Sequence, residues 1–422
     1  MGAPLRRIGS WGRAIAPLCA VGCVAFAACG GAGGATASGG GASGASGASV
    51  STGNGGASAG GGGGGAGGSD AGDDDAGDGG GGAAGGTGDG GVPGDAASDP
   101  AAVVVIFLID GVMWPAVDTA IANGAANMKF LIDNGVRAEV AHPSSPATLV
   151  QWPGGPPAPW GNATSGNSVV HTGTHLLEAA SSGMDDIFLA ARRAGIKSVF
   201  SGGDNNYQVY TTPDYHQSSS AITDEAVVQY AVTQLRADRQ VRLLRVHLQR
   251  IRDDWTGPAN MTDPSSRYLL HLVRNDLLIG TLVDALKALG AWDHTYFVLG
   301  ADHGMGTTSA SAHVPSQASS WKPFLIFYGP GLKRGETIPY AELPDVPVTA
   351  MRFLGVPPLR GHTAANVTLA QKGATGTFLA NLYAGAPADL AHPRYIDQYL
   401  ETSFPTTDDF GPYRDGMLRL IR

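Results

Sequence analysis

Cysteine is scarce in this chain, with three among 422 residues, and none lies beyond position 29. The rest of the chain therefore has no internal disulfide and no thiol for nucleophilic or redox chemistry. Its stability has to come from a hydrophobic core, which the roughly 320 residues of the carboxy-terminal part are enough to form.

The amino terminus lacks the run of about 20 apolar residues that a membrane-spanning helix needs. Its apolar stretch, residues 14–28, follows three arginines and ends in Phe26-Ala27-Ala28-Cys29. A basic segment, a short apolar segment and small residues are typical of a secretory signal peptide. The Phe-Ala-Ala-Cys ending resembles a bacterial lipobox, whose cysteine is lipidated and becomes the first mature residue.

We therefore predict that residues 1–28 are a signal peptide of the lipoprotein type and that the protein is exported to the bacterial cell envelope. Lipid on Cys29 would then be its only link to a membrane. The alternative is an ordinary secretory signal cleaved nearby, which would make the protein periplasmic or extracellular.

Large apolar residues are almost missing from residues 29–99, which consist mainly of glycine, alanine, serine, threonine and aspartate. Such a segment cannot bury enough surface to offset chain entropy, so we predict a flexible tether. Its eight aspartates account for most of the net charge of −9. With these and the three leader arginines set aside, residues 100–422 carry a net charge of −4. This mildly acidic charge argues against general binding of nucleic-acid polymers.

From residue 101 onward, apolar runs of strand length alternate with segments of helical periodicity. Residues 103–109 are a continuous apolar run, which is typical of a strand buried on both faces. This alternation predicts a largely parallel sheet sandwiched between helices, in one α/β domain over residues 100–422. We interpret residues 373–422 as a carboxy-terminal wrap. The other expected strands are 196–200, 243–248, 296–299 and 324–328, and the expected helices are 115–134, 184–194, 221–237 and 266–289.

Metal-ligand side chains follow two of the expected strands at their carboxyl ends, where ligands bind in such sheets. Asp110 follows the strand 103–109, and Asp302 and His303 follow an apolar run that ends near Gly300. Beyond Gly300 a glycine-flanked backbone lets both side chains turn to one point, which neighbours within a strand cannot do. Carboxylates and imidazoles are typical ligands of a divalent metal. The alternatives are a helix cap at Asp110 and an ordinary loop histidine at His303.

The segment from Asn162 to Gly173 is rich in hydroxyl and amide side chains. Thr164 and Ser165 stand just before an expected helix, where backbone N–H groups favour a phosphate and a divalent metal can activate a hydroxyl nucleophile. Asn167 follows one turn along, from where its amide reaches the same anion. The alternative is a cluster that only caps the helix, and spacing alone does not decide between the two.

In their order, these motifs resemble the alkaline phosphatase superfamily, nearest its type I phosphodiesterase/nucleotide pyrophosphatase and phosphonoacetate hydrolase-like branches. The resemblance covers residues 103–370. It rests on a strand ending Leu-Ile-Asp-Gly, a Thr-x-x-Asn segment leading to Thr-Gly, a strand before Asp-His-Gly-Met-Gly, and a histidine before Phe-Leu-Ile-Phe-Tyr-Gly-Pro-Gly.

This resemblance implies an alkaline phosphatase-like fold in which Asp110, Asp302 and His303 hold one metal. Thr164 would be its nucleophile and a further ligand, and Asn167 would hold the phosphoryl oxygens. The spacing from Thr164 to Gly173 is one residue shorter than is usual in the family, which leaves Ser165 open as the nucleophile.

A second metal is also implied, held by an Asp-x-x-x-His pair and a later histidine. Asp254 fits the aspartate and His313 the later histidine, but Pro258 occupies the place of the paired histidine and has no ligand atom. Three outcomes stay open. Another ligand such as Asp253 completes the second site, the enzyme works with one metal, or the site is degenerate and the protein a binder.

The resemblance thus implies a metal-dependent hydrolase of phosphoric esters, a phosphodiesterase or phosphatase, that forms a phospho-threonine intermediate. Zinc is the expected metal for mixed Asp/His ligation, and the expected partner is a phosphorylated small molecule or envelope component. The alternatives are a non-catalytic homologue that binds a phosphorylated envelope component, or a sulfatase-like hydrolase. The folded part has no Cys-x-Pro-x-Arg segment, which argues against the formylglycine of a sulfatase.

Overall fold

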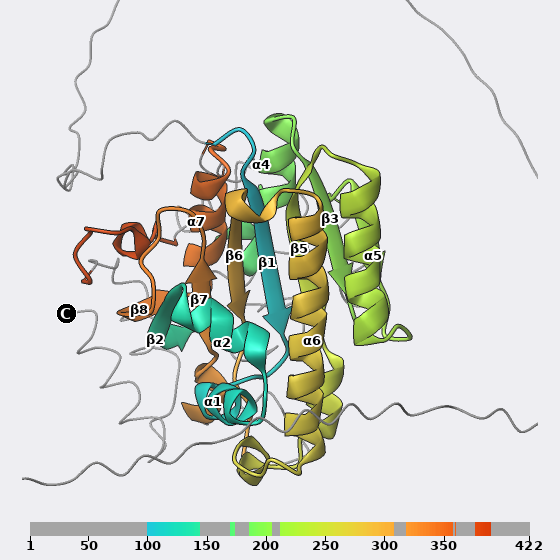
Figure 1. Cartoon of the computed structure of the whole chain (residues 1–422), viewed down its shortest axis with the longest axis vertical. Coiled ribbons are helices and arrows are strands. Elements are labelled where there is room, and N and C mark those ends of the chain that lie inside the picture. The colour runs from blue at the N-terminus through green and yellow to red at the C-terminus, as the bar shows by residue number, and fades with distance from the viewer. Residues whose placement is uncertain are drawn as a thin grey trace, which may run out of the picture. The chain divides into compact units, whose positions relative to one another are not determined.

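An eight-stranded sheet forms the centre of the part of the chain that the structure, a computed structural model, describes (Figure 1). That part belongs to one compact unit, Ala83–Arg422. It comprises residues 99–143, 169–173, 185–204, 212–307, 318–357, 359 and 376–389. The predicted signal peptide and nearly all of the predicted tether lie outside the described residues.

The strand order in the sheet is β4-β3-β5-β1-β6-β7-β2-β8. Every pairing is parallel except the two made by β7, which runs antiparallel to β6 and β2. The predicted largely parallel sheet is therefore confirmed. The strands are β1 Val103–Ile109, β2 Val136–His142, β3 Lys197–Gly202, β4 Tyr215–Ser218, β5 Val241–Leu248, β6 Thr295–Gly300, β7 Leu325–Tyr328 and β8 Glu336–Glu342.

Helices cover both faces of this sheet, as the alternation of patterns predicts. Alternate residues of β1 divide between two hydrophobic clusters: Val105 and Phe107 pack with residues of α1, α2, α5 and α6, and Val104 and Ile106 with residues of α4 and α7. Figure 1 shows α2, α5 and α6 in front of the sheet. The helices are α1 Trp114–Ala122, α2 Ala126–Asp133, α4 Ile187–Arg193, α5 Asp224–Ala237, α6 Arg267–Ala288 and α7 Asp345–Phe353. None of the described helices is both long and apolar enough to cross a membrane.

Several elements differ from the sequence expectation. The single helix expected over 115–134 is two helices, α1 and α2, because Gly124 between them has φ of +103°, a left-handed conformation that ends a helix. Strands β2, β4 and β8 and helix α7 were not expected. β4 and β8 are the edges of the sheet, where a strand is buried less completely and lacks the continuous apolar run of β1.

The described part of the predicted carboxy-terminal wrap packs against α7. The backbone N–H of Thr377 donates to Asp345 Oδ1 at 2.6 Å, and that of Leu379 donates to Thr349 Oγ1 at 3.1 Å. Leu379 and Leu382 are buried in the core cluster that contains α7. This segment therefore completes the hydrophobic core on the α4/α7 face of the sheet.

Candidate metal centre

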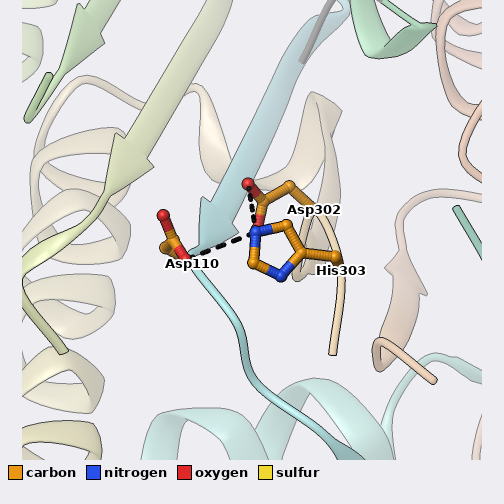
Figure 2. A group of neighbouring side chains, drawn as sticks. All are labelled: Asp110, Asp302 and His303. Carbon is orange, nitrogen blue, oxygen red and sulfur yellow. Dashed lines mark ion pairs between the residues drawn. The ribbon is translucent and has the colours of Figure 1, made fainter. Parts of the chain in front are cut away.

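Asp110 and Asp302 leave two neighbouring parallel strands at the same edge of the sheet. β1 pairs with β6 so that Leu108 lies opposite Gly300, and each chain reaches its aspartate two residues later. His303 follows Asp302 in the loop after β6. Figure 2 shows the three side chains together beyond the end of β1. The strand does end at Gly300, as the sequence predicts.

The glycines next to these ligand-type residues lie where a side chain would clash with neighbouring atoms. Gly111 has φ of +65°, and a Cβ there would overlap the sulfur of Met305, so the turn after Asp110 needs a residue without a side chain. A Cβ at Gly304 would overlap the backbone carbonyl oxygen of Ser319. The Asp-Gly and Asp-His-Gly-Met segments of the sequence therefore pack against each other at close range.

Three ligand-type atoms converge between these turns. His303 Nε2 lies 3.5 Å from Asp110 Oδ1 and 3.5 Å from Asp302 Oδ2. Nδ1 of His303 donates to the carbonyl oxygen of Gly304 at 2.6 Å, so the neutral imidazole keeps its lone pair on Nε2. Asp110 Oδ1 is buried, and no donor among the described residues reaches it. Lone pairs thus face one another in a buried space, an arrangement that a cation stabilises.

The electrostatics of Asp110 lead to the same conclusion. Burial, together with the like charge of Asp302, raises the pKa of Asp110 to about 7, against the opposing effects of His303 and Arg252. The surroundings therefore disfavour its charged form unless a positive charge is added. A divalent metal supplies that charge.

The distances also fit a metal. Two ligands about 2.0–2.1 Å from a tetrahedral zinc ion lie roughly 3.3–3.4 Å apart, close to the 3.5 Å between His303 Nε2 and each carboxylate oxygen. Among the described residues, one cluster of side chains has the atoms and the spacing to hold a metal ion, and it consists of Asp110, Asp302 and His303. Three ligands from the described residues leave a fourth position of a tetrahedral zinc site for another ligand.

Two buried residues of β5 support Asp302. Arg245 donates from Nη2 to Nδ1 of His247 at 3.0 Å, and because a guanidinium has only donors, the proton of His247 is on Nε2. That nitrogen faces Asp302 Oδ2 at 3.8 Å. Burial lowers the pKa of His247 to about 3, so the ring is neutral. The other oxygen, Asp302 Oδ1, accepts from the backbone N–H of Gly111 at 3.2 Å.

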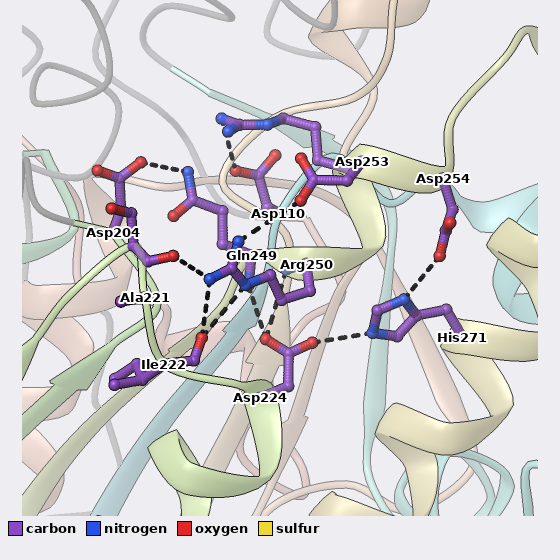
Figure 3. Close-up of polar contacts among 12 residues, drawn as sticks. Asp110, Asp204, Ala221, Ile222, Asp224, Gln249, Arg250, Asp253, Asp254 and His271 are labelled. Carbon is purple, nitrogen blue, oxygen red and sulfur yellow. Dashed lines mark hydrogen bonds and ion pairs between the residues drawn. The ribbon is translucent and has the colours of Figure 1, made fainter. Parts of the chain in front are cut away.

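Asp254, the aspartate predicted for a second metal, lies in a different set of contacts. Its Oδ2 is 2.9 Å from Nδ1 of His271, whose Nε2 is 3.1 Å from Asp224 Oδ2 (Figure 3). Its Oδ1 is 3.1 Å from Nη2 of Arg267. An arginine thus contacts this carboxylate together with a histidine whose pKa is raised by Asp224 and Asp254 against the effect of burial. The assignment of Asp254 to a metal stays a prediction.

The remaining predicted site residues, Thr164, Asn167 and His313, lie outside the described residues, as does the competing Ser165. The sequence interpretation overlooked His247, Arg252 and His271. One signal existed for the first of these: Arg245 and His247 are polar residues two apart in an apolar strand, so they share one face. No comparable pattern marks Arg252 or His271.

No protein-family model and no curated protein sequence matches the chain. Among solved structures it is similar to murine ectonucleotide pyrophosphatase/phosphodiesterase 5, with 12% identity over 67% of this chain and 100% of that one, and a TM-score of 0.46. It is similar to the phosphonate monoester hydrolase of Agrobacterium radiobacter, with 13% identity over 68% and 78% of the two chains and a TM-score of 0.47.

It is also similar to BT4656, solved in complex with its substrate D-glucosamine-2-N,6-O-disulfate, with 13% identity over 68% and 82% of the two chains and a TM-score of 0.48. These proteins are members of the alkaline phosphatase superfamily, the one that the sequence motifs resemble.

Asp302→Asn is expected to weaken zinc binding by more than about 100-fold, because it removes one of the two ligand charges while keeping an oxygen that accepts from Gly111. Titration calorimetry and the zinc content of the dialysed protein measure this. Asp254→Asn is the matched comparison, since it leaves the three-residue centre intact. If the wild type binds two zinc ions per chain and Asp254→Asn binds one, Asp254 is a ligand of a second metal. Wild-type affinity in Asp302→Asn would contradict the centre described here.

Proposed function

We propose that the protein is an exported, metal-dependent hydrolase of phosphoric esters, with a diester as its substrate class. The observation that supports this most is the buried convergence of Asp110, Asp302 and His303. It lies at the carboxyl edge of a largely parallel sheet, where enzymes of this architecture bind their ligands. The order of the motifs adds a hydroxyl nucleophile on the segment that precedes Val169.

The described residues near that segment suit this proposal. Residues 169–172 are helical and follow shortly after Thr164 and Ser165, and Val169 and Val170 are buried in the core on the α4/α7 face. These four helical residues agree with a helix after the Thr-Ser pair, and the start of that helix lies outside the described residues. Of the two hydroxyls, Thr164 is the proposed nucleophile because only Thr164 has an asparagine, Asn167, three residues on.

In the proposed reaction, Thr164 Oγ1 attacks the phosphorus atom, and the bond from phosphorus to the leaving oxygen breaks. The first alcohol departs, and the remaining phosphoryl group stays on Thr164. Water then hydrolyses this phospho-threonine, which releases a phosphoric monoester and restores the hydroxyl. A divalent metal, when bound, favours the alkoxide and stabilises charge that develops on the phosphoryl oxygens. Asn167 is proposed to donate to one of those oxygens.

We expect Thr164→Ala to lower turnover of bis(4-nitrophenyl) phosphate by about 10³-fold or more, because the covalent route is lost. Ser165→Ala is the matched control and should keep most of the activity. Mass spectrometry of acid-quenched wild-type protein should find the phosphate on Thr164. Loss of activity in Ser165→Ala with Thr164→Ala unaffected would move the nucleophile to Ser165. A zinc-loaded protein that hydrolyses no phosphoric ester, phosphonate or sulfate ester would favour the non-catalytic binder.

We further propose that the mature protein is held on the cell envelope by lipid on Cys29, with residues 30–99 as tether. In a bacterial host, the membrane fraction should yield a mature amino-terminal peptide that begins with a lipid-modified Cys29. Cys29→Ser should instead leave an unprocessed precursor without lipid. An unmodified mature amino terminus at another residue would show that the leader is an ordinary secretory signal.

A further inference from the structure

Arg252 brings a positive charge to the rim of the metal centre. It lies on the 3₁₀ helix η2, Arg250–Asp254, which directly follows β5, the strand next to β1 in the sheet. Its Nη1 is 3.5 Å from Asp110 Oδ2. The arginine side chain is 29% exposed, whereas that of Asp110 is 2% exposed. The guanidinium therefore extends from solvent to the edge of the buried centre.

The other charged residues of η2 that the structure describes turn elsewhere. Arg250 donates to the carbonyl oxygens of Ser220 and Ile222 (Figure 3). Asp253 is largely exposed and lies near Arg250, at 3.7 Å. Asp254 is engaged by His271 and Arg267. In this helical turn, Arg252 is thus the residue directed at Asp110.

The two oxygens of Asp110 face different groups. Oδ1 faces His303 Nε2 and is the oxygen that would ligate a metal, while Oδ2 faces the guanidinium of Arg252. A metal and Arg252 would therefore lie on two sides of one carboxylate. An ester that reaches the centre from the side of Arg252, where the structure shows a partly exposed side chain, would meet this guanidinium. A guanidinium presents several N–H donors in a planar fork that suits the oxygens of such an ester.

The charges of the described groups at the centre favour a singly charged substrate. A divalent cation balances the carboxylates of Asp110 and Asp302, and His247 is neutral as argued above; an imidazole that ligates a metal is neutral, so His303 adds no charge to the loaded centre. Buried Arg245 and nearby Asp204 carry opposite charges, so Arg252 leaves one net positive charge. A phosphoric diester carries one negative charge, which neutralises this positive charge. A doubly charged monoester would leave one buried negative charge without a partner, which is costly.

We infer that Arg252 is a catalytic residue that binds the non-bridging oxygens of a singly charged ester at the Asp110–Asp302–His303 centre. This inference rests on the proposed function and deepens it, because it assigns to a side chain a positive charge of the kind that a second metal would bring. The charge stabilises the oxygens most as the transition state develops, so its loss is expected mainly in kcat.

A different role is that Arg252 only holds Asp110 in position, and metal affinity separates the two roles. If Arg252 positions Asp110, removing it weakens zinc binding. If Arg252 serves the substrate, removing it takes a positive charge away from a cation site, and zinc binds equally well or more tightly.

The experiment compares wild-type zinc-loaded protein with Arg252→Gln, Arg252→Lys and the control Arg274→Gln. Arg274 lies on α6, is 64% exposed and pairs with Glu225, away from the centre. Three quantities are measured: turnover of bis(4-nitrophenyl) phosphate and of 4-nitrophenyl phosphate, calorimetric binding of diethyl phosphate, and the zinc dissociation constant.

We expect Arg252→Gln to lower diester turnover by about 10²–10³-fold, to weaken diethyl phosphate binding, and to leave zinc binding unchanged or tighter. The diester turnover of Arg252→Lys should lie between those of the wild type and Arg252→Gln, because lysine keeps the positive charge and lacks the planar set of N–H donors. Arg274→Gln should match the wild type, and the wild type should prefer the diester over the monoester.

Wild-type diester turnover in Arg252→Gln, with Asp302→Asn inactive, would overturn the inference and leave the proposed function standing. Zinc loss in Arg252→Gln, or a wild-type preference for the monoester, would also overturn it. If the wild type hydrolyses no ester, the proposed function fails. Diethyl phosphate binding then decides separately whether Arg252 binds the anion, since equal binding by wild type and Arg252→Gln would contradict it.

Discussion

The centre of this protein depends on the burial of two carboxylates beside one imidazole. Asp110, Asp302 and His303 are 2–4% exposed, and moving an ionised carboxylate out of water costs several kcal/mol unless an opposite charge compensates for it. The rise of the Asp110 pKa to about 7 expresses that cost. A divalent cation at the point where their lone pairs converge removes it. The arrangement therefore suits a bound divalent metal.

Much of the local structure follows from that arrangement. Two parallel strands have to end in register, and the turns beyond them have to pack closely, which explains why Gly111 and Gly304 admit no side chain. His247 presents its Nε2–H toward Asp302 because Arg245 occupies its other nitrogen. Arg252 adds a positive charge on the solvent side of Asp110. Each neighbour supplies a donor or a cation to an acidic centre.

The strands that build this centre could be predicted from the sequence, whereas the strands at the edges of the sheet could not. β1 and β6 are continuous apolar runs that end in ligand-type residues, so both the strands and the grouping of Asp110, Asp302 and His303 could be predicted. β2 and β8 mix polar and apolar residues, and α1 and α2 share one periodic pattern that only the conformation of Gly124 divides. Arg252 could not be predicted, because it lies among other charged residues in η2 and no pattern marks which of them is directed at Asp110.

The most direct measurement is anomalous X-ray diffraction from zinc-loaded crystals of the mature protein, recorded at the zinc absorption edge. The account predicts a zinc peak about 2.0–2.2 Å from His303 Nε2, Asp110 Oδ1 and Asp302 Oδ2. An anomalous peak that has none of these three residues as ligands, or an Asp110–Asp302–His303 centre that stays empty at saturating zinc, would contradict it.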